Sequence, residues 1–166
     1  MSLNPLITSC TALLLCLLSW QAVALSTDKD QPVSIEADSV DINEADQLAI
    51  YRGKVIVIQG SIRINASKVV VHDFQSDSAY LVATGDLVKF RQTADDQQQI
   101  KGAGKQVEYA LNDAELILTG DAELIKGQYV SKSDRIIYDR EKALVKAGAS
   151  AAGKERVKIT IGPKAK

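Results

Sequence analysis

The side chains best suited to acid–base or nucleophilic chemistry are sparse in this chain. His72 is the only histidine, and Asp73 follows it directly. A neighbouring carboxylate can orient a histidine as a general base, but no serine or cysteine stands in a recognisable nucleophile motif. Because His72 ends the apolar run Val69–Val71, the favoured interpretation is a solvent-facing histidine at the end of a strand.

Metal and carboxylate sites have equally little support. A zinc site needs three or four nitrogen, sulfur or oxygen ligands, and both cysteines, Cys10 and Cys16, fall in an apolar N-terminal segment. Paired carboxylates can hydrolyse glycosidic bonds, but the candidate acids lie mostly in polar loops and turns, where such residues cap the backbone. We therefore expect no enzyme activity, no metal and no cofactor. The candidate pairs are Asp38 with Asp41, Asp95 with Asp96, and Asp113 with Glu115.

Residues 1–24 predict a cleavable signal peptide. They contain no charged side chain, and the apolar run 13–18 is followed by Ala22-Val23-Ala24. A short apolar helix and a small-x-small sequence are what a signal peptidase requires. The run falls short of the ~20 apolar residues that span a bilayer, although an uncleaved anchor stays a second possibility. We expect cleavage after Ala24, an exported domain over residues 25–162 without cysteines, disorder up to Lys29, and a flexible tail over residues 163–166.

The charge pattern excludes some classes of partner. The chain has 20 lysines and arginines and 21 aspartates and glutamates, for a formal net charge of −1. A nucleic-acid-binding protein usually carries a basic stripe, whereas the two signs alternate along this sequence. We expect no nucleic-acid binding and no strong attraction to anionic membrane surfaces.

The elements that must position any site are predicted to be strands. Apolar residues recur at every second position almost throughout, as in Val33-x-Ile35 and Val107-x-Tyr109-x-Leu111. This period and the many β-branched side chains are typical of half-buried strands. Glycine-containing turns separate the strands at short, even intervals, which favours a sandwich, a barrel or a roll.

The chain also repeats itself. Val40, Gly53 and Gly60 recur as Val107, Gly120 and Gly127, each 67 positions later. A repeat of this kind predicts two stacked halves that share one core and leave an unpaired strand edge at each end.

Several runs are apolar on both faces of the expected strand. Examples are Val55–Ile58, Val69–Val71 and Leu116–Leu118. A sandwich strand normally buries only one face. Such strands are therefore either central strands covered on both sides, or strands with one face lining an interior open to lipid.

Four segments resemble the OstA-like family of lipopolysaccharide transport proteins. They are Gln31–Asp38, Gly53–Val71, Tyr109–Leu111 and Leu118–Ala122, and the likeness extends over roughly Asp30 to Ala147. The resemblance implies an all-β fold. This would be a twisted, open β-jelly roll of about 16 antiparallel strands, built from two repeated halves around a hydrophobic interior groove.

The resemblance also implies a role in outer-membrane biogenesis of Gram-negative cells. It implies a periplasmic carrier that shields the acyl chains of lipopolysaccharide between the inner and outer membranes. The implied partners are an ATP-driven inner-membrane extraction complex with its bitopic OstA-like subunit, an outer-membrane translocon, and further copies joined head to tail. By the same likeness, the acyl-chain contacts would be Val33, Ile35, Phe90, Tyr109 and Leu111.

Two features of the sequence suit this role, and two alternatives stay open. The run Val157–Ile161 alternates as a strand and could add to the N-terminal strand of a neighbouring copy. It could equally pair only within its own sheet. The balanced charge suits a carrier whose lipid keeps its sugars in solvent. The alternatives are a secreted polysaccharide-active enzyme, with an aromatic-lined polar cleft, and a structural envelope repeat with a dry, packed core.

Overall fold

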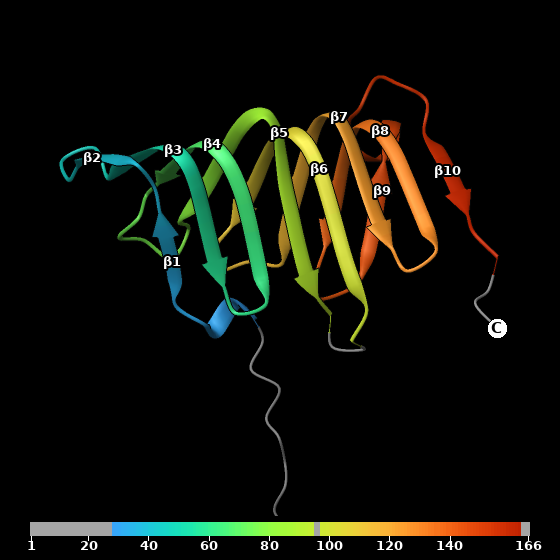
Figure 1. Cartoon of the computed structure of the whole chain (residues 1–166), viewed down its shortest axis with the longest axis horizontal. Helices are drawn as coiled ribbons and strands as arrows, with labels where there is room; N and C mark the ends of the chain where they lie inside the picture. The colour runs from blue at the N-terminus through green and yellow to red at the C-terminus, as the bar shows by residue number, and fades with distance from the viewer. Residues whose placement is uncertain (1–27, 95–96, 164–166) are drawn as a thin grey trace, which may run out of the picture.

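The computed structural model describes residues 28–94 and 97–163, so the expected signal peptide lies outside the described residues. One short 3-10 helix precedes ten strands, and a second lies between the last two (Figure 1). The elements are η2 (Asp28–Asp30), β1 (Val33–Glu36), β2 (Ser39–Asn43), β3 (Leu48–Gln59), β4 (Ile62–His72), β5 (Tyr80–Thr93), β6 (Gln99–Ala110), β7 (Glu115–Lys126), β8 (Tyr129–Asp139), β9 (Leu144–Ala147), η3 (Gly148–Ala151) and β10 (Lys158–Ile161).

All ten strands form one antiparallel sheet that does not close on itself. Strands β3 to β8 follow one another in chain order, each paired with its sequence neighbours. At one end β1 and β2 both pair with β3, and at the other end β9 and β10 both pair with β8. The expected all-β, antiparallel and open architecture is confirmed.

Each long strand bends near its middle, and the bends fold the sheet into two layers (Figure 1). The five pairings between β3 and β8 all shift register at the bend. Such irregularities bend a strand and increase its twist. At two bends the backbone needs a positive φ, which Gly53 supplies at 80° and Gly120 at 75°.

The bends divide the sheet into two half-sheets. The β1–β10 half-sheet contains β1, β10 and residues 55–59, 62–65, 88–93, 99–103, 122–126 and 129–133. The β2–β9 half-sheet contains β2, β9 and residues 48–52, 68–72, 80–84, 106–110, 115–119 and 135–139.

The count of about 16 strands is not confirmed, since the described residues form ten. The reason is that each of the six long strands passes through both half-sheets without a break in the chain. The division into two halves is not confirmed either, because one continuous sheet joins all the strands. The repeat is nevertheless visible locally, since β7 and β8 begin and end 67 positions after β3 and β4.

The core lies between the two half-sheets. Inward side chains alternate with outward ones, as in β4, where Ile62, Ile64, Val69 and Val71 are buried. The core is aliphatic apart from Phe90, Tyr109 and Tyr138, and it runs through every long strand. Burying aliphatic side chains contributes roughly 1.5–3 kcal/mol each, so the roll needs no disulfide.

The N-terminal end of the described chain is fixed rather than disordered. Asp28 accepts hydrogen bonds from the Ser61 backbone N–H at 2.7 Å, the Ser61 hydroxyl at 2.9 Å and the Gln92 amide at 2.8 Å. The expectation of disorder up to Lys29 was therefore wrong at Asp28 and Lys29. Within residues 28–94 and 97–163, no helix has the length and apolar character needed to cross a membrane.

Candidate functional site

The five side chains expected to contact lipid all belong to the interior between the half-sheets. Phe90 is 2 % exposed and Tyr109 is fully buried. Val33 and Ile35 on β1, and Leu111 just after β6, are half-buried and pack against the same core. The structure therefore brings the five together around one aliphatic interior, with the β1 pair at its N-terminal end.

The two half-sheets are joined along the bends and meet again along the opposite side, which we call the mouth. Because each long strand starts in one half-sheet and ends in the other, successive connections alternate between the two sides of the mouth. Residues 60–61 and 127–128 border it on the β1–β10 half-sheet. Residues 73–79, 111–114 and 140–143 border it on the β2–β9 half-sheet.

A buried polar cluster bridges the mouth near its N-terminal end. The Tyr109 hydroxyl donates a hydrogen bond to Gln59 Oε1 at 2.5 Å and accepts one from Arg140 Nη1 at 3.1 Å. The Gln59 amide nitrogen lies 3.4 Å from the Leu111 carbonyl oxygen on the facing half-sheet. The Arg140 guanidinium also covers the Tyr109 ring, 4.7 Å from its centroid. We call Gln59, Tyr109 and Arg140 the latch.

Two further contacts join the same two sides. Lys29 Nζ lies 2.6 Å from Glu141 Oε1, forming an exposed ion pair. Lys126 Nζ donates a hydrogen bond to the Ala143 carbonyl at 3.4 Å. Exposed ion pairs contribute only ~0–1 kcal/mol each, so the buried latch is the stronger connection.

Burial raises the pKa of the Tyr109 phenol to about 12, and the nearby Arg140 charge only partly offsets this effect. The phenol therefore stays protonated at neutral pH and keeps its role as hydrogen-bond donor to Gln59. A proton donor with so high a pKa is poorly matched to acid–base catalysis near neutrality. The arrangement is suited to holding two layers together.

Sequence reasoning missed Gln59 and Arg140. The signal for Gln59 was available, because it continues the inward alternation of Val55 and Val57 and is only 2 % exposed. A polar residue at an inward position needs a buried partner. Arg140 gave no comparable signal, because it follows the end of β8 and reaches the latch only through the folding of the sheet.

Three of the residues considered for catalysis have partners of their own. His72 stacks on the Tyr80 ring with centroids 4.7 Å apart. Asp41 pairs with Arg52, and the Asp113 carboxylate accepts a hydrogen bond from the next backbone N–H. Asp95 and Asp96 lie outside the described residues. Among the residues that the structure describes, no group of three or more His, Cys, Asp or Glu side chains is arranged to hold a metal.

In the sheet formed by the described residues, both ends present strand edges that no further strand covers, with apolar side chains. At the C-terminal end, Ile159 and Ile161 of β10 are 60 % and 63 % exposed. At the N-terminal end, Val40 and Ile42 of β2 are 47 % and 58 % exposed. An unpaired edge with exposed apolar residues is a template for pairing with another chain.

Comparison with known proteins gives a consistent family. Residues 34–143 match the family described as LptA/(LptD N-terminal domain) LPS transport protein. The lipopolysaccharide export system protein LptH of Pseudomonas aeruginosa is 29% identical, over 98% of this chain and 95% of that protein. LptA of Haemophilus influenzae is 31% identical, over 89% of this chain and 86% of its own length. For LptA of Escherichia coli K12 the identity is 34%, over 70% of this chain and 64% of that protein.

A solved structure has the same fold. The crystal structure of LptH from Pseudomonas aeruginosa, described as the LptA homologous periplasmic component of the lipopolysaccharide transport device, superimposes with a TM-score of 0.74. The match covers 83% of this chain and all of the other at 25% identity.

Proposed function

Since the chain belongs to the LptA/LptD N-terminal-domain family of lipopolysaccharide transport proteins, we propose that it carries lipopolysaccharide through the periplasm as one unit of a bridge between the two membranes. The observation that carries this proposal is the aliphatic interior between the two half-sheets. The long strands connect the half-sheets only at the bends. Along the mouth the two layers are held by side-chain contacts that can part.

The interior offers acyl chains a place away from water. Each buried CH₂ contributes ~0.8 kcal/mol, so several acyl chains could not cross an aqueous compartment unprotected. The core side chains of the two half-sheets are buried and packed against one another. Acyl chains therefore take the place of contacts between the two half-sheets, and the layers part at the mouth to admit them.

In this proposal Val33, Ile35, Phe90, Tyr109 and Leu111 contact the acyl chains. The two β1 residues and Leu111 are half-buried already and lie at the N-terminal end of the roll. Phe90 and Tyr109 are deeper and become accessible only after the mouth has opened. No catalytic residue, metal or cofactor is needed for this transfer.

The test is binding of purified rough-type lipopolysaccharide to Ile35→Asp, with Ser34→Asp as the matched control. Ile35 is half-buried and packs against the interior, and Ser34, the residue just before it on β1, is exposed. We expect Ile35→Asp to lose saturable binding and keep the β-sheet circular dichroism spectrum, and Ser34→Asp to bind like wild type. Equal binding by both variants would contradict the proposal, as would equal loss by both.

We also propose that copies join head to tail. The free edge of β10 would add to the N-terminal edge of the next copy, and both edges expose apolar side chains. Such a contact does not close on itself and extends into a filament. The same edges would meet the inner-membrane extraction complex, with its anchored relative of this fold, and the outer-membrane translocon.

A further inference from the structure

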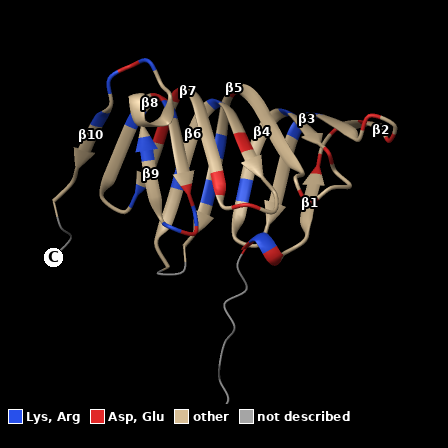
Figure 2. Ribbon diagram, turned by 180° about the vertical axis from the view of Figure 1, so that it is seen from behind, with Lys and Arg blue, Asp and Glu red and all other residues tan. Residues whose placement is uncertain are grey.

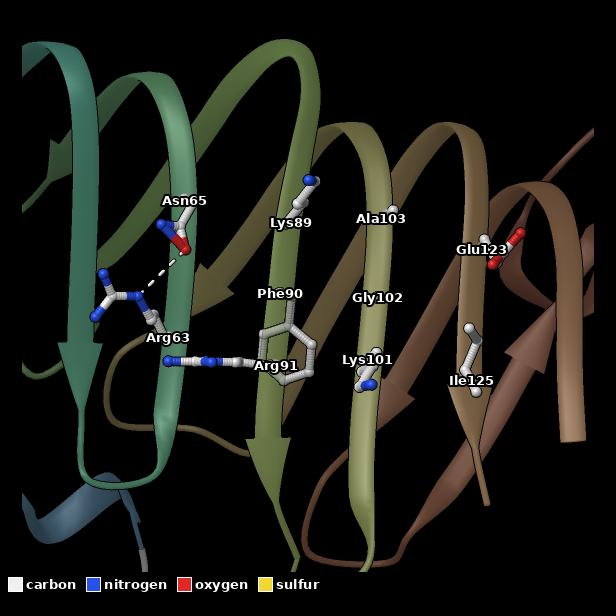
Figure 3. Close-up of a pocket in the computed structure, with 10 residues that line it drawn as sticks. All are labelled: Arg63, Asn65, Lys89, Phe90, Arg91, Lys101, Gly102, Ala103, Glu123 and Ile125. Atoms are coloured by element: carbon white, nitrogen blue, oxygen red, sulfur yellow. Dashed lines mark hydrogen bonds between the residues drawn. The ribbon is translucent and has the colours of Figure 1, made fainter. Parts of the chain in front are cut away.

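The outer surface of the β1–β10 half-sheet carries a row of cations that the transport role does not explain. Arg63 on β4 lies opposite Arg91 on β5, and Arg91 lies opposite Lys101 on β6. We call these three residues the basic row. Lys89 lies beside the row, two positions before Arg91 on β5 (Figure 3). Elsewhere in the sheet, basic and acidic positions are distributed along the strands (Figure 2).

The basic row borders a depression of about 620 Å³ in the outer surface. The depression lies beside Ala103 on β6, an outward position that carries only a methyl group among the long cationic side chains (Figure 3). Its lining residues are Arg63, Asn65, Lys89, Phe90, Arg91, Lys101, Gly102, Ala103, Glu123 and Ile125.

This arrangement opposes stability in the absence of a ligand. Like charges directly opposite on neighbouring strands repel one another. In residues 28–94 and 97–163, neither Lys89 nor any member of the basic row takes part in an ion pair. Glu123, the one carboxylate that lines the depression, pairs instead with Lys132 on β8. The row therefore holds uncompensated positive charge in a chain whose net charge is −1.

The row lies close to the mouth. Arg91 and Lys101 lie two residues from the strand ends at Thr93 and Gln99, and Arg63 lies one residue from the start of β4 at Ile62. Two residues of strand span about 7 Å. A lipid whose acyl chains enter through the mouth must leave its phosphorylated sugars outside, within reach of this surface.

We propose that the basic row and Lys89 bind the phosphate groups of the lipopolysaccharide saccharide while its acyl chains occupy the interior. Arginine presents a planar fork of donors that suits phosphate oxygens, and two of the three row members are arginines. The row runs across neighbouring strands, parallel to the mouth, so it guides the head group in the direction in which the bridge extends. This inference rests on the proposed function and adds a specificity for phosphorylated lipid.

The test compares R63Q/R91Q/K101Q with wild type for two lipids, bis-phosphorylated lipid A and the same lipid after enzymatic removal of both phosphates. Surface charge pairs contribute little individually, so the three substitutions together should weaken binding of the phosphorylated lipid about tenfold at low salt. Binding of the dephosphorylated lipid should be unchanged. The variant should melt no lower than wild type, because it loses cross-strand repulsion.

The matched control is K54Q/K68Q/K146Q, which changes the net charge equally with exposed residues away from this face. It should bind both lipids like wild type. Equal weakening by both triple variants would overturn the inference in favour of a net-charge effect, as would equal weakening for both lipids. If wild-type protein binds neither lipid, the proposed function fails and the inference with it. If wild type binds both lipids equally, only the inference fails.

A competition arm distinguishes the source of the phosphate. Millimolar inorganic phosphate should displace phosphorylated lipid A from wild type by less than twofold, because free phosphate lacks the acyl chains that hold the head group beside the row. Full displacement would show that the row is a site for free phosphate and would overturn the proposed link to the lipid.

Discussion

The latch makes Tyr109→Phe the most informative single substitution. It removes one oxygen atom and leaves the ring in place. Gln59 Oε1 then has lost its hydrogen bond from the phenol, and one Arg140 N–H has lost its acceptor. Leaving a buried polar group unsatisfied costs about 1–3 kcal/mol, so urea unfolding should show a loss of that size.

The same substitution should change how stability depends on alkaline pH. The pKa of the Tyr109 phenol is raised from its ordinary 10.0 to about 12 by burial. The unfolded chain therefore releases this proton at lower pH than the folded protein does. The stabilising contribution is complete below pH 10 and is lost as the pH rises from 10 to 12. Its total is about 2–3 kcal/mol at 1.36 kcal/mol per pKa unit.

The assay is urea unfolding of wild type and Tyr109→Phe between pH 7 and pH 12, with Tyr80→Phe as the control. Tyr80 is 37 % exposed on the outer face of its half-sheet, where its ring stacks on His72 and takes no part in the latch. The difference in unfolding free energy between wild type and Tyr109→Phe should shrink above pH 10, while Tyr80→Phe should follow wild type within about 0.5 kcal/mol. The reasoning is refuted if Tyr109→Phe is as stable as wild type at pH 7, or if the difference does not change with pH.

Three further predictions concern the bends and the edges. Gly53→Ala should lower the unfolding free energy by more than about 1 kcal/mol, because φ is 80° there and a Cβ would overlap the Asp38 carboxylate. Gly162→Ala, where a Cβ would make only ordinary van der Waals contact with Gln128, should change it by less than about 0.5 kcal/mol. The Lys154 N–H donates a hydrogen bond to the Asp134 carboxylate at 2.6 Å, which lowers the pKa of that carboxyl. Asp134→Asn should therefore speed amide hydrogen exchange in residues 154–161, and in wild type the exchange should speed up as the pH falls through the lowered pKa. Unchanged exchange would contradict this. In the pairing of β10 with β8 the Gly162 N–H donates to Gln128, so the N–H of Ile159, three positions earlier, faces the free edge. Ile159→Pro should therefore abolish concentration-dependent self-association in analytical ultracentrifugation without a loss of monomer stability above about 1 kcal/mol, and undiminished association would rule out pairing through this edge.

The sequence predicted the strands well because their burial alternates with period two and their turns carry glycine. Val33-x-Ile35 and the inward residues of β6 were placed correctly on that basis. The sequence could not reveal that Gly53 lies at a bend within one strand that passes through both half-sheets. Glycine is typical of turns between strands as well as of bends within a strand. For that reason about 16 strands were expected, whereas the described residues form ten.

The interior could be predicted better than the mouth. An aliphatic face is a local pattern, and the five expected contact residues all lie on it. The latch joins Gln59 to Tyr109, 50 residues later, and to Arg140. The basic row depends on strand register, which sets Arg63 opposite Arg91. Neither grouping is visible until the sheet is folded.

The central claim is that the mouth must part before acyl chains can enter the interior. It is tested most directly by a cleavable bis-maleimide bridge between K29C and E141C, the two sides of the ion pair at the mouth, with Cys10 and Cys16 replaced by serine. A bridge between D139C and K142C, which lie on one side of the mouth, is the control. We predict that the first bridge abolishes lipopolysaccharide binding until it is cleaved and that the control bridge has no effect. Undiminished binding by the protein bridged across the mouth would contradict the account.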